Sequence, residues 1–171
     1  MGYETNFDGN LVINPALKSE HLDFLTGFCN TRRMKRNEEI VSTYSDPTRE
    51  AVNLPIGRDG GFYVGDRDNY GQSRTHDIID YNSPPRDQHG LWCGWSPSDD
   101  GMYLTAQDGK NYNYTDWLKY LIENFFNPWG YKLNGSINWE GEDSGDVGII
   151  KVTNNQVKTL VAEITFKEES D

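Results

Sequence analysis

The chain has 171 residues, a net charge of −11 and an aromatic content of 13%. This aromatic content can build a buried core, so the composition excludes a disordered chain and predicts one folded domain over residues 1–171. The negative charge opposes binding to nucleic acid phosphates, and no run approaches the roughly 20 apolar residues that a membrane helix needs.

The arginines and the tryptophans occupy different parts of the chain. All eight arginines lie between Arg32 and Arg86, and all five tryptophans lie between Trp92 and Trp139. Tryptophan brings a large buried area, whereas arginine recognises carboxylates and phosphates through its planar fork. The sequence therefore predicts a rigid core in the second half and a recognition surface in the first half.

A strand and a helix are predicted near the start. Residues 3–13 alternate between apolar and polar side chains, which is typical of a strand, and Asn14-Pro15 ends it. Residues 19–33 carry apolar side chains at helical spacing. A basic run lies at the end of this helix and consists of Arg32, Arg33, Lys35 and Arg36. It either stabilises the helix C-terminus through the helix dipole or forms a small anion-binding patch.

The cysteines bear on the cellular compartment. Cys29 and Cys93 both lie among apolar neighbours, so we expect two buried free thiols. The sequence shows no secretory leader, and two unpaired cysteines are usual in a reducing compartment. We therefore expect a cytoplasmic protein.

Little regular structure is predicted in the middle of the chain. Residues 46–90 are rich in proline and glycine, and the longest irregular part spans 57–90. A loop of this length is uncommon in a compact domain unless it has a function. We therefore treat 57–90 as the region that recognises a partner.

The pattern becomes regular after Gly90. Strands are predicted over 91–95 and 102–106, followed by a helix that begins near Asn113 and ends at Asn127-Pro128. The apolar stripe of this helix consists of Trp117, Leu118, Leu121, Ile122 and Phe125. Its expected partners in the sheet are Trp92, Ile137 and Trp139.

Three further strands complete the prediction. They span 131–139, 147–152 and 157–166, and residues 167–171 form a solvated tail. The elements together predict an α+β fold with an antiparallel sheet of six or seven strands and two helices packed on one face.

No motif specifies a catalytic site, a cofactor or a metal. Four carboxylates lie within 140–146, but their spacing differs from that of calcium-binding loops, and a solvated hairpin tip explains them. His76 and His89 lie in the long loop near acidic residues. A Cys-His pair that uses Cys93 has no support in the spacing. We therefore predict no cofactor and no metal.

Two segments carry specific aromatic motifs. Residues 91–101 read LWCGWSPSDDG, and residues 112–143 read YNYTDWLKYLIENFFNPWGYKLNGSINWEGED. With YETNFDGNLVINPAL near the start, they resemble a family of small uncharacterised bacterial and phage-associated proteins. These share LWCxWxP before a DG turn and PWGYxLNGxIxWxGE after an aromatic helix. The resemblance implies phage association and loops of fixed geometry, but no reaction.

These observations favour a non-enzymatic binding or regulatory protein whose partner is a protein or a small ligand. A phage-associated modulator of a host factor is one specific form. Two alternatives remain open: an acidic mimic of nucleic acid that inhibits a nucleic-acid-binding protein, and an enzyme of unknown type that uses His76 or His89. We expect no direct binding to nucleic acid or to membranes, and the oligomeric state is left open.

The expected recognition residues lie in the irregular region, with Trp95 as the floor of the site. They combine the aromatic, amide and guanidinium groups that anchor many binding surfaces. They are Tyr63, Tyr70, Gln72, Arg74, Tyr81 and Gln88.

Overall fold

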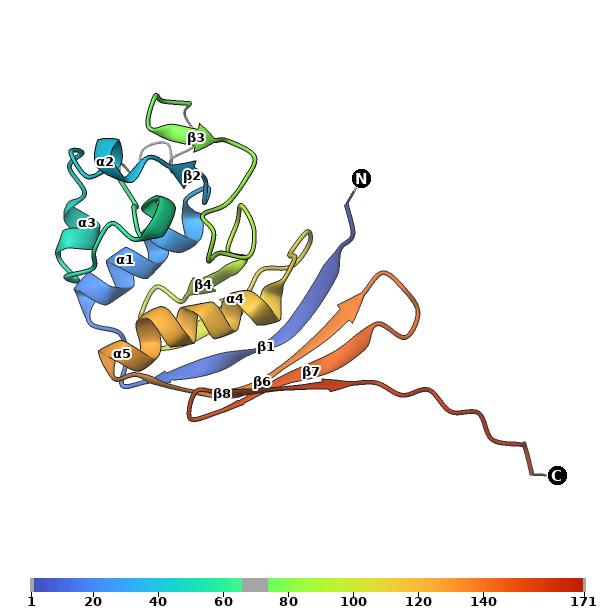
Figure 1. Cartoon of the computed structure of the whole chain (residues 1–171). Coiled ribbons are helices and arrows are strands. Elements are labelled where there is room, and N and C mark those ends of the chain that lie inside the picture. Colours follow the sequence, from blue (N-terminus) through green and yellow to red (C-terminus); the bar gives the residue numbers. More distant parts are fainter. Residues whose placement is uncertain (1, 66–73, 171) are drawn as a thin grey trace.

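The structure is a computed structural model that describes residues 2–65 and 74–170. Its main feature is an antiparallel six-stranded sheet in the order β4-β5-β1-β6-β7-β8, with α1 and α4 on one face (Figure 1). This arrangement confirms the predicted α+β fold. The elements are β1 (Thr5–Asn14), α1 (Ser19–Asn30), β2 (Lys35–Arg36), α2 (Glu38–Val41), α3 (Pro47–Glu50), the short 3-10 helix η1 (Arg58–Gly60), β3 (Ile78–Asp80), β4 (Trp95–Pro97), β5 (Tyr103–Ala106), α4 (Tyr114–Leu121), the π-helical segment η2 (Ile122–Phe126), α5 (Asn127–Trp129), β6 (Lys132–Gly141), β7 (Val147–Thr153) and β8 (Gln156–Val161).

Strand β1 lies in the middle of the sheet. It pairs with β6 over its whole length, from Thr5 opposite Gly141 to Asn14 opposite Lys132, and its other neighbour is β5. Leu11 is buried on the helix side, whereas the residues on either side of it in the sequence are exposed. The alternation predicted a strand here, and the structure confirms it.

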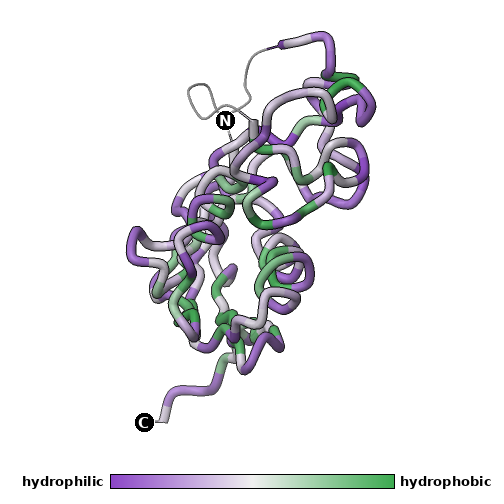
Figure 2. Tube along the Cα trace, turned by 90° about the vertical axis from the view of Figure 1, so that its left-hand side faces the viewer, coloured by the Kyte–Doolittle hydropathy of each residue, from purple (hydrophilic) through white to green (hydrophobic). Residues whose placement is uncertain are grey.

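The helices bury the predicted apolar stripe. Trp117, Leu121 and Phe125 are fully buried, and Phe28 of α1 packs edge-on against the rings of Trp117 and Phe125. Figure 2 shows hydrophobic residues concentrated in the packed elements and hydrophilic residues along the outer loops. Aromatic rings thus form the contact between the two helices.

Trp92 does not belong to this core, and its prediction as a core partner was wrong. Its side chain is 41% exposed, whereas Trp95, three residues later, is fully buried. Gly94 lies between them with a φ of 74°, a left-handed conformation that interrupts the alternation of a strand. The strand therefore starts at Trp95 and not at residue 91.

The helix formed by α4, η2 and α5 extends beyond Pro128, where it was predicted to end. Pro128 occupies the first turn of α5, where a helix tolerates a residue without an N–H group. The helix ends instead at Gly130, whose φ of 87° is the left-handed conformation usual after a helix C-terminus.

The last strand is shorter than predicted. β8 ends at Val161, and within the described part of the chain one further backbone bond follows, from Ala162 N to Val147 O at 3.0 Å. Because β7 begins at Val147, the residues after Ala162 have no strand of their own sheet to pair with. Ile164 and Phe166 are consequently exposed.

The two cysteines are buried, as predicted, and they lie together. Their Sγ atoms are 3.7 Å apart and join α1 to the segment before β4. The hydrogen bond with Cys93, followed by burial, raises the pKa of the Cys29 thiol. No helix in the described parts of the chain is long and apolar enough to cross a membrane.

Candidate functional site

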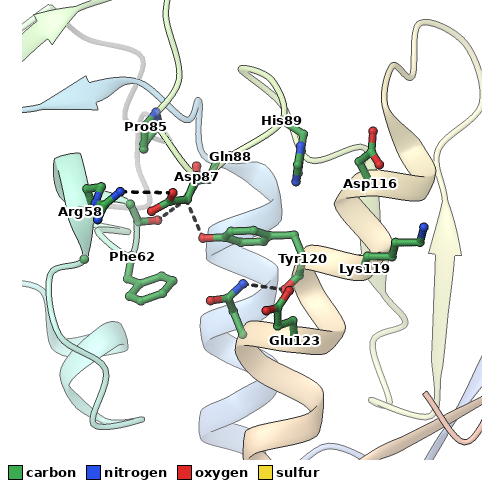
Figure 3. A pocket seen from close by; sticks show the side chains of 13 residues that line it. Arg58, Phe62, Pro85, Asp87, Gln88, His89, Asp116, Lys119, Tyr120 and Glu123 are labelled. Carbon is green, nitrogen blue, oxygen red and sulfur yellow. Dashed lines mark hydrogen bonds and ion pairs between the residues drawn. The ribbon is translucent and has the colours of Figure 1, made fainter. Parts of the chain in front are cut away.

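A pocket of about 460 Å³ lies between helix α4 and two irregular segments of the middle region (Figure 3). The irregular segments are those around η1 and before β4, and the opposite wall is the outward face of α4 and η2. The lining residues are Gly57, Arg58, Gly61, Phe62, Pro85, Asp87, Gln88, His89, Asp116, Lys119, Tyr120, Glu123 and Asn124. The region 57–90 therefore contributes one wall of a concave site.

Charged groups of both signs line this pocket. Arg58 and Asp87 form an exposed ion pair of 3.6 Å, and Figure 3 shows them on the opposite side from Asp116 and Lys119. Tyr120 lies between the two sides, so a ligand in the pocket would meet a cation and an anion at each end.

Gln88 holds the wall of the pocket in place. Its Nε2 donates to Gly61 O at 2.6 Å and to the Tyr120 hydroxyl at 3.0 Å. Burial raises the pKa of Tyr120 to about 12, so this hydroxyl keeps its proton at neutral pH. The Gln88 Oε1 atom is buried and has no hydrogen-bond partner among the described residues.

A buried arginine fixes the same loop from below. Arg33 is 1% exposed, and its guanidinium donates to the carbonyl oxygens of Gly61 at 3.2 Å and Tyr63 at 2.6 Å. Burial lowers its pKa to about 10, which leaves the side chain charged at neutral pH. It also donates to Phe28 O near the end of α1 at 3.5 Å. Arg33 thus joins the helix end to the loop.

Two residues of the basic run, Arg33 and Arg36, take no part in an anion-binding patch. Arg33 is engaged with carbonyl oxygens, and Arg36, also buried, binds the Asp77 carboxylate at 2.6 Å. Of the two interpretations that the sequence left open, helix capping describes Arg33 in part. The structure assigns both side chains to the interior of the irregular region.

The two segments that line the pocket are tied together by Asp59. Its Oδ2 accepts hydrogen bonds from the backbone N and the Nε of Arg86, both at 3.0 Å. Burial alone would raise the pKa of Asp59, but the bonds from Arg86 lower it, so the carboxylate stays ionised. Asp59 has a φ of 55°, and this conformation turns the chain toward Arg86.

The predicted site residues are dispersed. Gln88 lines the pocket. Tyr63 is buried with the Arg36 guanidinium 4.8 Å from its ring centre. Trp95 is fully buried in the core and donates from Nε1 to Tyr114 O at 2.8 Å, so it is not the floor of the pocket.

Two other predicted residues come together on the surface. The guanidinium of Arg74 lies 4.4 Å from the ring centre of Tyr81, and that of Arg32 lies 4.1 Å from the same ring. Tyr70 and Gln72 lie outside the described residues.

The α4 wall was missed in the sequence. Asp116, Lys119 and Glu123 recur at helical spacing on the face opposite the apolar stripe, a pattern that a helix face in contact with solvent shows as well. Glu123 also lies in the π-helical segment η2. Such segments are rare and frequently occur at functional sites.

The two histidines proposed for catalysis are placed differently relative to the pocket. The His89 ring packs edge-on against Trp117 and Tyr120 and, within the described parts of the chain, makes no hydrogen bond to a carboxylate. His76 is exposed and does not line this pocket. No group of metal-ligating side chains occurs in residues 2–65 and 74–170.

Comparison with known proteins does not assign the chain to a family. No family model, no curated protein and no solved structure matches the chain. The family indicated by the aromatic motifs therefore stays a prediction, and the site has to be interpreted from its own geometry.

Proposed function

We propose that the chain is a non-enzymatic binding protein whose pocket takes a polar segment of a partner protein. The observation that carries the proposal is a pocket with charges of both signs at its rim and an irregular wall fixed by buried polar bonds. Its volume lies in the range of about 300–1,000 Å³ that is usual for ligand sites. A modulator of a host factor, as the phage resemblance implies, is the specific form that we favour.

The mixed charge defines the chemistry of the ligand. Arg58 and Lys119 suit a carboxylate, whereas Asp87, Asp116 and Glu123 suit an ammonium or a guanidinium. A peptide segment with both charges satisfies the two ends at once. Because Arg33, Asp59 and Gln88 already hold the wall, binding orders few new groups, which favours affinity.

The alternatives receive unequal support. An enzyme would require a histidine beside a carboxylate in a pocket, and His89 lines the same pocket as Asp87 and Asp116. No bond orients that histidine in the described structure, so we rank catalysis second. An acidic mimic requires carboxylates without interspersed cations, and Arg58 and Lys119 interrupt such a pattern here.

Titration of the ¹⁵N-labelled protein with short peptides tests the proposal. Peptides that carry both lysine and glutamate should shift the amide signals of Gly57, Gly61 and Lys119, and matched glutamine peptides should not. Lys119→Glu should remove the response, because it reverses one of the two pocket cations. Lys110→Glu, an exposed residue outside this pocket, is the matched control and should leave it unchanged. Shifts that cluster elsewhere, or an equal response to neutral peptides, would contradict the proposal.

A further inference from the structure

The residues after β8 continue a strand pattern beyond the sheet. Even-numbered residues of β8 face away from the helices, and the apolar residues Leu160, Ala162, Ile164 and Phe166 continue that face. Phe166 is 95% exposed and Val161 is 77% exposed. Figure 1 shows this segment leaving the sheet in an extended conformation. A strand-forming segment with so many exposed apolar groups lacks its packing partner.

The outer edge of β8 is also unpaired. β8 is the last strand in the order of the sheet, so one row of its backbone N–H and C=O groups bonds to no strand among the described residues. Proteins usually protect such edges with prolines, charges or a cover, because an unpaired edge invites another strand. Lys158 is the only charged residue within β8 itself.

An apolar groove lies beside this edge. It has a volume of about 600 Å³ and runs across β1, β6, β7 and β8, and its β7 and β8 side includes Ile149, Leu160 and Ala162. The tail starts from Ala162, at the groove itself. A second extended segment laid along the outer edge of β8 would place its outward side chains next to Leu160 and Ala162, at the rim of this groove.

The charges favour an acidic segment as the neighbour. Lys151 and Lys158 lie directly opposite each other in the β7–β8 register, and neither makes an ion pair within the described residues. Like charges that face each other across two strands are unfavourable. The segment after Phe166 reads KEES, and its Glu168 and Glu169 supply the missing carboxylates.

We propose that two copies of this chain associate through β8 and the residues that follow it, as antiparallel strands that join two sheets edge to edge. A two-fold axis perpendicular to the sheet keeps the face away from the helices on the same side in both copies. Even-numbered residues of one copy therefore lie opposite even-numbered residues of the other. Placing Leu160 opposite the partner's Phe166 puts Ala162 opposite the partner's Ile164. The same register puts Lys158 opposite the partner's Glu168. One alignment thus pairs the exposed apolar side chains with each other and gives Lys158 a carboxylate partner.

This register has one unfavourable contact that makes it testable. The axis passes through residue 163, so Glu163 of one copy faces Glu163 of the partner subunit. Removing that repulsion should strengthen the association. A pairing with an unrelated strand would not respond in this way.

Sedimentation equilibrium of the full chain provides the first test. We expect a monomer–dimer equilibrium with a dissociation constant on the order of 10 μM, because edge pairing buries a small area. Phe166→Asp should weaken it by about tenfold or more, since each dimer loses two buried rings. Glu163→Gln should tighten it severalfold. Met102→Asp, an exposed apolar residue beside the far edge of the sheet, is the control and should have no effect.

A cross-link tests the register. In the presence of oxidised glutathione, Glu163→Cys should form a disulfide between two copies, because symmetric antiparallel neighbours lie within disulfide distance. Ala162→Cys should cross-link much more slowly. A chain that stays monomeric up to roughly 1 mM, or a dimer that Phe166→Asp leaves intact, overturns the proposal. The pocket lies on the helix side of the sheet, so these outcomes are independent of the peptide titration.

Discussion

Between α1 and β4, five charged side chains are buried among the residues that the structure describes: Arg33, Arg36, Asp46, Asp59 and Asp77. Each is bonded to a loop backbone or to an opposite charge, as Asp46 is to the N–H groups of Val64 and Gly65. Buried charges of this kind add little net stability, but they select one arrangement of the loops. They explain why a segment with so few helices and strands still forms a defined pocket wall.

Asp77→Asn should destabilise the protein and change its response to acid. It removes the carboxylate that Arg36 binds at 2.6 Å, and loss of one partner of a buried pair costs about 3–5 kcal/mol. Burial alone would raise the pKa of Asp77, but hydrogen bonds from Thr75 and Arg36 hold it below the usual 3.8. A depressed folded-state pKa contributes stability above the unfolded value, and that contribution is lost as the pH falls through the folded value.

The measurement is urea unfolding of both proteins between neutral pH and about pH 3. The stability difference should be constant down to about pH 5 and should shrink below about pH 4. Asp99→Asn, at an exposed turn, serves as the control and should show neither effect. A difference that grows on acidification would contradict the assignment.

Leu121→Ala tests the core at the scale of single residues. Leu121 is fully buried on α4, and such a truncation costs about 2–5 kcal/mol through lost burial and the cavity left behind. Lys119→Ala, two residues away on the exposed face, should change the free energy of unfolding by less than about 0.5 kcal/mol. Equal effects in chemical denaturation would mean that the helix faces are wrongly assigned.

At the scale of elements, the helix α4–η2–α5 shows what periodicity predicts. Its apolar stripe was found because burial against the sheet repeats with the helical period. Its end was misplaced because Pro128 is also compatible with a first turn, and the sequence does not reveal that a π-helical segment precedes it. The same limit applies to β8, whose length depends on where β7 begins.

Gly130 should be the residue that ends this helix. Its φ is 87°, and a Cβ added there would meet nothing within 4 Å, so any penalty comes from the backbone alone. Gly130→Ala should cost about 1 kcal/mol, and Gly130→Asn should cost less because asparagine tolerates the left-handed conformation. Thermal unfolding of the two variants provides the comparison, and an asparagine variant as unstable as the alanine variant would contradict this reason.

At the scale of the whole molecule, the net charge predicts whether the protein binds nucleic acids. The net charge is −11, and the basic run that might have opposed it has Arg33 and Arg36 buried. We expect no submicromolar binding to duplex DNA or RNA at physiological salt. A gel-shift assay checks this, with a basic DNA-binding protein as the positive control. Retardation of the duplex at submicromolar protein would contradict this expectation.

The fold was more predictable from the sequence than the site. Strands and helices bury one face. Apolar residues such as Leu11 in β1 and Trp117 in α4 therefore lie at positions that repeat with the period of that face. Polar residues repeat on the outward face of α4 in the same way whether that face meets solvent or lines a pocket. The sequence around Lys119 therefore did not indicate a pocket. Nothing in the sequence distinguished the buried Arg33 from the partly exposed Arg32 and Lys35 of the basic run. Only the arrangement in space separates these cases.

The central position of β1 affects how the protein is made on the ribosome. β1 ends at Asn14, and its main partner strand is complete only at Gly141. At about 5–20 residues per second, translation leaves this strand without that partner for roughly 6–25 s. Until β5 is complete at Ala106, Leu11 has no partner strand at all, and from there to Gly141 β1 can pair along one edge only. The nascent chain therefore cannot build its sheet in the order of synthesis, and the first strand made is among the last to be fully paired.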